Sequence, residues 1–400
     1  MNINVGRYDG SDVAKQKIEI VERKGLGHPD TICDSIMNQV SIDLSAAYLK
    51  EFGAIMHHNT DKALLVAGET MKRFGGGIVK QPMLLVFGDR ATFEVGGKSI
   101  PVNEIAVNAA KKWIKNRMRF VDPEKHMKYQ VELKRGSEEL TDIFKRKGKV
   151  LGANDTSAAV GFAPMTKTES AVYNLEKFLN SSDFKKEFPE TGEDIKVMCV
   201  RNGDNFIFTI ALAFVDRFVD SEEDYFRKKD EVHERVVEFL KTKEDIKSLR
   251  VDINTLDAKG RGLGGVYLTV LGTSAEDGDC GEVGRGNRAN GIIPLMRPGS
   301  TEAAAGKNPV SHVGKIYNLL TFDLADEIYK KVNGIDGVYV WLVSQIGVPI
   351  DQPLIADAQL ISKTEIDEKT KKQVQEIIEN RLLNIKDFCK RLIGGGIEVC

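Results

Sequence analysis

Short runs of alternating or helically spaced apolar residues divide the start of the chain into predicted elements. Between residues 17 and 22, Ile18 and Ile20 alternate with polar residues, which predicts a half-buried strand. A glycine-containing turn over residues 24–30 follows. Apolar residues then recur every fourth position, at Ile32, Ile36, Val40 and Leu44. This spacing predicts an amphipathic helix capped by Asp30 or Thr31.

The rest of the chain mixes strands and helices without regular alternation. The clearest element is a hairpin whose strands, residues 196–201 and 206–214, flank Asn202-Gly203-Asp204-Asn205, because Asn-Gly favours the positive φ angles of tight turns. Further strands are expected at residues 63–67, 83–87, 266–271 and 337–343, and helices at residues 221–243, 309–331 and 367–383. The lack of repeated strand–helix–strand units favours an α+β fold over a doubly wound sheet.

The composition narrows the class of protein. The 400 residues carry a formal net charge of −2, without the basic excess typical of nucleic-acid-binding proteins. No apolar stretch approaches the roughly 18 residues that a membrane-spanning helix needs, and the N-terminus lacks the apolar core of a secretion signal. The five cysteines are odd in number and form no Cys-x-x-Cys pair, which argues against a disulfide framework or a zinc site. We therefore expect a cytoplasmic protein that binds neither nucleic acid nor membranes.

The first candidate for chemistry is the segment Gly25-Leu26-Gly27-His28-Pro29-Asp30. Its glycines let the backbone approach a ligand, and the N–H groups of the following helix suit a phosphate. Asp30 adds a hard oxygen ligand of the kind that magnesium prefers. The alternative is a plain turn, with a proline in the first helical position and an aspartate cap.

Two further segments combine charge with glycine. Residues 276–288 place carboxylates, which hold metal ions, beside arginines, which grip phosphate oxygens. An exposed, mobile loop explains this composition equally well. In Gly306-Lys307-Asn308-Pro309, a lysine precedes a predicted helix, which again suits an anion. Alone, that signal is weak.

Other patterns are less telling. Residues 260–265 fit G-x-G-x-x-G but lead into a strand, which excludes the dinucleotide-binding interpretation, and no P-loop sequence is present. Gly136 and Ser137 are candidates for a phosphate-binding turn. A serine cap followed by acidic residues explains that segment equally well and is favoured.

Three of these segments together resemble the S-adenosylmethionine synthetases, also called methionine adenosyltransferases. The run Gly27-His28-Pro29-Asp30, preceded by Glu22, resembles the ATP loop of that family. The run Gly278-Asp279-Cys280-Gly281, followed by Gly284-Arg285, resembles its second nucleotide motif, and residues 306–309 are similar to its lysine-bearing loop. The order and spacing of the motifs fit along nearly the whole chain.

The resemblance implies synthesis of S-adenosylmethionine from ATP, L-methionine and water, with release of phosphate and pyrophosphate. It implies Mg²⁺ and K⁺ as cofactors and a homodimer with active sites at its interface. It also implies three similar subdomains of mixed β-sheet with packed helices, which we expect at residues 1–125, 126–265 and 266–400, interleaved in sequence. Two alternatives use the same groups: another Mg-ATP-dependent enzyme, such as a kinase or a ligase, and a nucleotide-sensing module without turnover.

The resemblance also carries roles onto individual residues. The catalytic candidates are His28, Arg285 and Lys307. The ATP-binding candidates are Glu22, His28, Gly136, Ser137, Lys196, Asp279, Arg285 and Lys307. The candidates for methionine binding are Glu69 and Asp155, and the candidates for metal binding are Asp30 and Asp279.

Several positions depart from the bacterial and eukaryotic pattern and resemble the archaeal branch. Lysines of that pattern are replaced by Thr31, Gly286 and Ser311, and a metal-binding aspartate by Val313. These losses leave the second magnesium without assigned ligands, and Arg288, His312 and Lys315 are candidates to replace the missing cations. A gate is expected between residues 134 and 152, and Asn59 lies in the segment nearest the family's potassium site.

Overall fold

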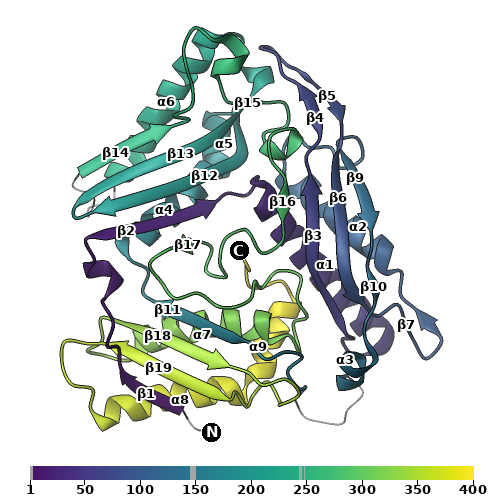
Figure 1. Ribbon diagram of the computed structural model, residues 1–400, viewed down its shortest axis with the longest axis vertical. Coiled ribbons are helices and arrows are strands. Elements are labelled where there is room, and N and C mark those ends of the chain that lie inside the picture. The colour runs from purple at the N-terminus through teal and green to yellow at the C-terminus, as the bar shows by residue number, and fades with distance from the viewer. Residues whose placement is uncertain (1–2, 145–149, 243–245, 247) are drawn as a thin grey trace.

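The computed structural model describes residues 3–144, 150–242, 246 and 248–400. Figure 1 shows the three larger β-sheets grouped around the centre of the molecule, where the C-terminus lies. Each sheet combines strands that are far apart in the sequence. The expectation of an α+β fold with mixed sheets and packed helices is confirmed. The expected gate includes residues 145–149, which lie outside the described residues.

Sheet A joins the two ends of the chain. Its strands, in order across the sheet, are β1 (Ile3–Arg7), β19 (Ile355–Ile361), β18 (Gly337–Val343) and β11 (Ala158–Ala163). The helices of this unit are α7 (Val313–Lys331), α8 (Glu368–Leu383) and α9 (Ile385–Ile393). Apolar residues of these helices form one buried core with one face of the sheet. The opposite face carries a small aromatic cluster that includes Phe162 and Tyr339.

Sheet B contains the strand that leads into the first candidate loop. Its strands, in order, are β14 (Ser248–Ile253), β13 (Asn205–Val215), β12 (Thr191–Asn202), β2 (Ile18–Lys24) and β17 (Ile293–Pro294), with β15 (Leu268–Thr269) beside β13. Its helices are α4 (Lys167–Leu179), α5 (Ser182–Glu187) and α6 (Glu222–Lys241). A second apolar core lies between these helices and the sheet.

Sheet C holds the helix that follows the first loop. Its strands, in order, are β10 (Lys134–Arg135), β6 (Met83–Ala91), β3 (His58–Val66) and β16 (Gly281–Glu282), with β9 (Met127–Val131) beside β6. Helices α1 (Pro29–Phe52) and α2 (Val102–Arg117) complete its core. The remaining elements are the hairpins β4 (Glu69–Met71)–β5 (Ile78–Gln81) and β7 (Glu94–Val95)–β8 (Lys98–Ser99), and the short helix α3 (Glu138–Ile143).

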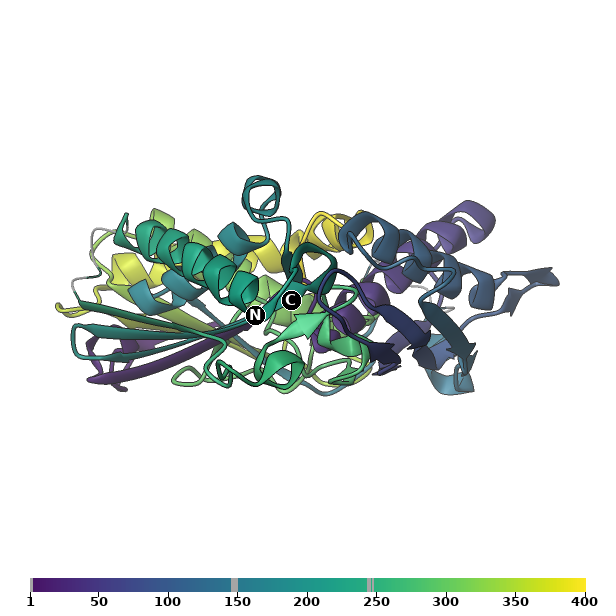
Figure 2. The same cartoon turned by 90° about the horizontal axis from the view of Figure 1, so that it is seen from above.

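The longer helices gather on one side of the sheets, as Figure 2 shows for α6 above β12 to β14. Large apolar side chains remain accessible on strand residues, at 39% for Ile18, 44% for Leu64 and 54% for Ile78. None of the helices in the described parts of the chain is long and apolar enough to cross a membrane.

Two local expectations need correction. The N-cap of α1 is His28, not Asp30 or Thr31, because its imidazole accepts the Asp30 backbone N–H. The strand expected over residues 266–271 is reduced to β15. The N–H groups of Val270 and Leu271 donate to the Glu276 carboxylate, at 2.7 and 2.5 Å, and so cannot pair with a neighbouring strand. By contrast, the hairpin expected around Asn202–Asn205 is confirmed as β12 and β13, with φ of 61° at Gly203.

Candidate functional site

The first loop turns from β2 into α1 by packing against β12. The Gly25 N–H donates to the Ile195 carbonyl at 2.6 Å, and the Gly27 N–H donates to the Glu193 carbonyl at 2.9 Å. A Cβ atom at Gly27 would lie 2.5 Å from the backbone nitrogen of Asp194. The glycines are therefore required for contact with a neighbouring strand, in addition to any approach to a ligand.

The second loop wraps around the start of α1, although about 250 residues separate the two motifs. The backbone N–H of Glu282 donates to Asp30 Oδ1 at 2.9 Å, and that of Gly284 donates to Asp34 Oδ1 at 2.8 Å. A Cβ atom at Gly281 would lie 2.2 Å from the Pro29 carbonyl oxygen. The first and second motifs thus form one site.

Asp30 is held by the protein at both oxygens. Its Oδ2 lies 2.8 Å from the Lys24 ammonium, which also donates to the Arg285 carbonyl at 2.6 Å. A metal ion at Asp30 would therefore compete with Lys24. Asp279 is exposed, and its Oδ1 accepts the Cys280 N–H at 2.9 Å.

The described residues contain no group of three histidine, cysteine or acidic side chains placed to hold a metal ion. Magnesium, however, characteristically uses one or two protein carboxylates, water and substrate phosphates. The donor set of Asp30 and Asp279, near the cationic groups described below, fits that mode of binding.

His28 is neutral in this site. Burial lowers the pKa of its imidazole to about 4, against an opposing effect of Asp30. Its Nδ1 accepts the Asp30 N–H at 3.2 Å. A neutral imidazole has one donor and one acceptor nitrogen, so the proton resides on Nε2. The side chain therefore offers an uncharged N–H donor.

Cationic and anionic groups surround His28. On one face of sheet B, the Lys196 ammonium lies 3.4 Å from the Glu22 carboxylate, and β12 pairs Lys196 with Lys24. Both Lys196 and Asp279 are close enough to His28 to influence its pKa. The Arg285 side chain is exposed and has no hydrogen bond or ion pair with any described residue.

Glu69 lies near the second loop. The Ala67 N–H, two residues before Glu69, contacts Cys280 Sγ at 3.4 Å, and the Thr70 hydroxyl donates to Asp277. Glu69 itself is exposed at the start of β4. The geometry therefore brings Glu69 to the same part of the molecule as Asp279.

Lys307 belongs to a second, buried cluster. Its ammonium forms an ion pair with Asp61 and lies 3.1 Å from Glu302. The Asn59 carboxamide donates to Asp61 at 3.0 Å and to Asp89 at 3.1 Å. The Lys307 carbonyl accepts a hydrogen bond from Ser41 of α1 at 2.9 Å. No contact between described residues joins Lys307 directly to His28 or Arg285.

Two candidates for replacing missing cations are also buried here. Burial lowers the pKa of Lys315 to about 7 and that of His312 to about 3. The Lys315 ammonium donates to Asn38 of α1 at 2.7 Å. His312 caps α7 by accepting the Gly314 N–H at 3.2 Å. The third candidate, Arg288, is exposed on the second loop.

The remaining candidates lie elsewhere in the chain. Asp155 precedes β11 in sheet A, where its carbonyl accepts the Ser344 hydroxyl at 2.9 Å. Gly136 and Ser137 connect β10 to α3, and Gly136 lies against the His57 ring. No contact between described residues links these three residues to His28. Ser137 is the N-cap of α3 but makes no side-chain capping hydrogen bond.

The sequence interpretation missed three positioning side chains. Lys24 neutralises Asp30, Asp34 holds the second loop, and Asn287 binds the Lys24 backbone N–H and carbonyl, at 2.9 and 2.8 Å. Asp34 follows Asp30 by four residues, so the helical spacing places both carboxylates on one face of α1. That spacing could have identified Asp34, whereas no local signal identifies Asn287.

Known proteins similar to this chain agree on one family. The model of the S-adenosylmethionine synthetase (AdoMet synthetase) family matches residues 1–396. A probable S-adenosylmethionine synthase from Aquifex aeolicus is 46% identical, covering 98% of both chains. The S-adenosylmethionine synthase of Pyrobaculum aerophilum is also 46% identical, covering 99% of this chain and all of its own. The S-adenosylmethionine synthase of Methanothermobacter thermautotrophicus is 45% identical, covering 99% of both chains.

The fold has a solved counterpart. An unusual S-adenosylmethionine synthetase from Campylobacter jejuni superposes with a TM-score of 0.61 at 17% identity, over 92% of this chain and 89% of its own. At that identity the likeness concerns the fold alone. The full-length family match and the curated relatives establish that the chain belongs to the S-adenosylmethionine synthetase family.

Proposed function

We propose that this S-adenosylmethionine synthetase joins ATP to L-methionine at the start of α1, where the two nucleotide motifs meet. The single observation that carries the assignment is His28, whose Nδ1 accepts the Asp30 N–H and whose neutral ring therefore presents an Nε2–H donor, with Lys24 and Lys196 close enough to influence its pKa. The family match favours this activity over a kinase, a ligase or a nucleotide sensor.

In the proposed reaction, the methionine sulfur forms a bond to C5′ of ATP. The C5′–O5′ bond breaks, and its electron pair leaves with the triphosphate. A thioether has no proton to lose, so no general base is needed. The site must align sulfur with carbon and stabilise the negative charge that grows on the triphosphate. The triphosphate is then hydrolysed by water to phosphate and pyrophosphate.

The residues divide these tasks. The His28 N–H donates to the leaving oxygen, while Lys196 and Arg285 bind the triphosphate, supported by Glu22, which positions Lys196. Lys307 is proposed to contact the same polyphosphate. Gly136 and Ser137 stay candidates for ATP binding, and Glu69 and Asp155 stay candidates for methionine binding.

A bound Mg²⁺ ion would be held by Asp30 and Asp279 and would neutralise phosphate charge. For K⁺, we propose the surroundings of Asn59, whose buried Oδ1 has no partner among the described residues.

A second copy of the chain is proposed to complete the site. Accessible apolar residues on strands of three sheets, Ile18, Leu64 and Ile78, suit burial against a like surface. We further propose three subdomains, near residues 1–125, 126–265 and 266–400 and interleaved in sequence. We also propose a cytoplasmic location, which the five free cysteines support.

The test is incubation with ATP, L-methionine, Mg²⁺ and K⁺, with all products resolved by mass. S-Adenosylmethionine, pyrophosphate and phosphate are expected, and His28→Ala should abolish them. His126→Ala is a matched control, because the His126 imidazole also accepts a backbone N–H, from Asp122 at 3.0 Å, but lies in the turn before β9. AMP would indicate a ligase, ADP a kinase, and bound but unchanged ATP a sensor.

A further inference from the structure

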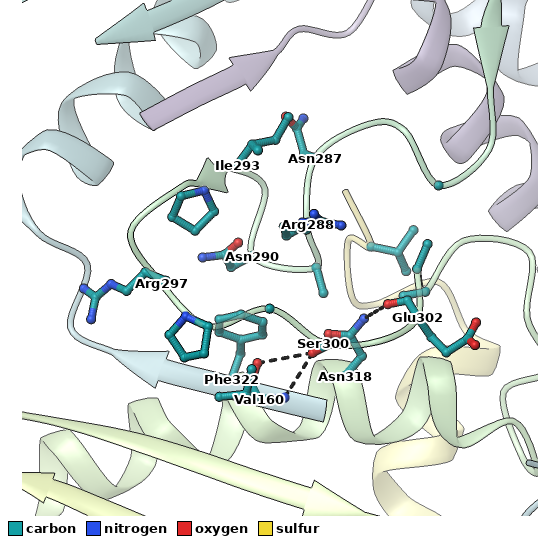
Figure 3. A pocket seen from close by; sticks show the side chains of 18 of the residues that line it. Val160, Asn287, Arg288, Asn290, Ile293, Arg297, Ser300, Glu302, Asn318 and Phe322 are labelled. Atoms are coloured by element: carbon teal, nitrogen blue, oxygen red, sulfur yellow. Dashed lines mark hydrogen bonds between the residues drawn. The ribbon is translucent and has the colours of Figure 1, made fainter. Parts of the chain in front are cut away.

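A cavity of about 200 Å³ lies beneath the segment that connects Arg285 to Lys307 (Figure 3). One wall is apolar, with Val160 and Phe162 from β11 and Phe322 from α7. The opposite wall is the connecting segment itself, including Arg288, Asn290 and Ile293. His28 does not line the cavity, although Asp34 of α1 and Gly284 of the second loop do.

Asn290 leaves a hydrogen-bonding group unused inside this cavity. Its Oδ1 and Nδ2 are both buried, yet neither has a partner among the described residues. Figure 3 shows its carboxamide directed into the space between Ile293 and Arg297. Buried polar groups without partners are rare in native proteins, and each calls for an explanation such as an absent ligand.

The other polar side chains around the cavity are already engaged. Asn287 is bonded to the Lys24 backbone, and Ser300 accepts the Val160 N–H at 3.0 Å. The Arg297 guanidinium is bound to Glu169 and the Tyr339 hydroxyl. The Arg288 side chain, in contrast, is exposed and makes no hydrogen bond, ion pair or ring contact with any described residue. The free groups are therefore one carboxamide inside the cavity and one guanidinium nearby.

These groups define the chemistry of an occupant. A carboxamide pairs in two hydrogen bonds with the donor and acceptor on the edge of an adenine ring. A cavity of roughly 150 Å³ with apolar walls accepts a benzene ring, so the present one is large enough for a planar base but too small for a whole nucleotide. We propose that the cavity binds the adenine ring of an adenine-bearing compound, with Asn290 reading its edge and Arg288 facing any anionic part.

The location couples this cavity to both nucleotide motifs. Asp34 and Glu302 both line it. Asp34 holds the backbone of Gly284, beside Arg285, and Glu302 lies 3.1 Å from the Lys307 ammonium. An occupant that contacts either carboxyl group would shift the segment that carries these cations. This regulatory consequence rests on the proposed function, whereas the binding itself does not.

Isothermal titration calorimetry with adenosine measures binding to the cavity. Methionine is left out, so that no turnover occurs. Asn290→Leu is expected to bind one adenosine fewer per chain than the unmodified protein, whether or not a second site also binds adenosine. The leucine has a similar volume, and removing an unpaired amide should leave thermal stability equal or higher. Asn333→Leu, at an exposed asparagine, is the control and should bind as much adenosine per chain as the unmodified protein.

Titrations with adenine, ATP and S-adenosylmethionine then show which compound supplies the adenine ring. Binding of free adenine shows that the base suffices. A site seen only with ATP or only with S-adenosylmethionine, and weakened at least tenfold by Arg288→Ala, identifies that compound as the occupant.

Equal stoichiometry in the unmodified protein and Asn290→Leu would overturn the proposal. Should the leucine variant fail to fold, adenine soaked into crystals of the unmodified protein decides the question: density facing Asn290 supports the site, and an empty cavity refutes it. Neither result depends on synthetase activity, which the product assay measures separately.

Discussion

The Lys307 ammonium forms an ion pair with the Asp61 carboxylate, although 246 positions separate the two residues in the chain. Both side chains are almost fully buried, at 3% and 5% exposed. The pair therefore fixes the lysine-bearing loop, residues 306–309, against β3. It also leaves the Lys307 ammonium with fewer free N–H donors for a phosphate than an exposed lysine would have.

Removing one partner of this pair should destabilise the fold. Lys307→Met or Asp61→Asn removes the nearest partner of a buried charge and leaves Asp61 with Lys62, or Lys307 with Glu302, which are both more exposed. We expect a cost of about 3 kcal/mol of unfolding free energy, the lower end of the range for a broken buried pair. The double variant should lose less than the sum, because no unpaired charge remains. Urea denaturation measures all three. Lys330→Met, which breaks the exposed pair with Asp326, is the control and should change stability little. A stable Lys307→Met protein would contradict the buried ion pair.

Asp89 should titrate far above an ordinary aspartate. Burial and the neighbouring Asp61 raise the pKa of Asp89 to about 7, while the pKa of Asp61 is lowered, chiefly by its contacts with Asp89 and Lys307 against an opposing burial effect. The folded protein then binds more protons than the unfolded chain between about pH 4 and 7. This group's contribution to stability is accordingly present at low pH and is lost as pH rises through 7. Carbon-13 NMR of labelled aspartates should detect the titration of Asp89, and Asp61→Asn should lower the pKa of Asp89.

His28 should resist protonation. Burial lowers its pKa to about 4, below the 6.5 of an unfolded histidine, so the unfolded chain binds more protons between those values. Its contribution to stability is present above pH 6.5 and is lost as pH falls through about 4. Histidine-labelled NMR should show a neutral ring with the proton on Nε2 at pH 6, assigned through His28→Gln. Asp30→Asn should lower the pKa further, because Asp30 favours the charged form. An imidazolium at pH 6 would contradict this assignment.

Gly27 should not tolerate a side chain. A Cβ atom there would lie 2.5 Å from backbone atoms of Glu193 and Asp194, which cannot move aside as a flexible side chain would. Gly27→Ala should therefore cost about 1–3 kcal/mol of unfolding free energy, and it should also reduce S-adenosylmethionine synthesis by displacing His28. Gly264→Ala is the matched control, since a Cβ atom there meets nothing within 4 Å. Equal stability of the two variants would refute the close packing.

Local sequence patterns predicted the elements that carry the site better than the contacts that assemble it. The hairpin at Asn202-Gly203 is visible in the sequence because two neighbouring residues determine the turn. The pairing of Asp34 with Gly284 and the burial of Lys307 by Asp61 depend on chain segments about 250 residues apart. No periodicity encodes such contacts. The glycines of the first loop were expected to let the backbone approach a ligand, which stays a prediction. The close approach that the structure has is to β12, which the pattern could not reveal.

Arg285 provides the clearest separation of function from stability. Its guanidinium is exposed and makes no hydrogen bond, ion pair or ring contact with a described residue, so Arg285→Ala should leave the melting temperature unchanged. If it stabilises the departing triphosphate, synthesis should fall about 10²-fold or more, as when a transition-state donor is removed elsewhere. Arg285→Lys should recover only part of the rate, because an ammonium lacks the two-pronged grip of a guanidinium. Arg261→Ala, at another exposed arginine in a glycine-rich loop, should retain full activity. Product formation by Arg285→Ala at the unmodified rate would remove Arg285 from the mechanism and leave Lys196 and Lys307 as the triphosphate-binding cations.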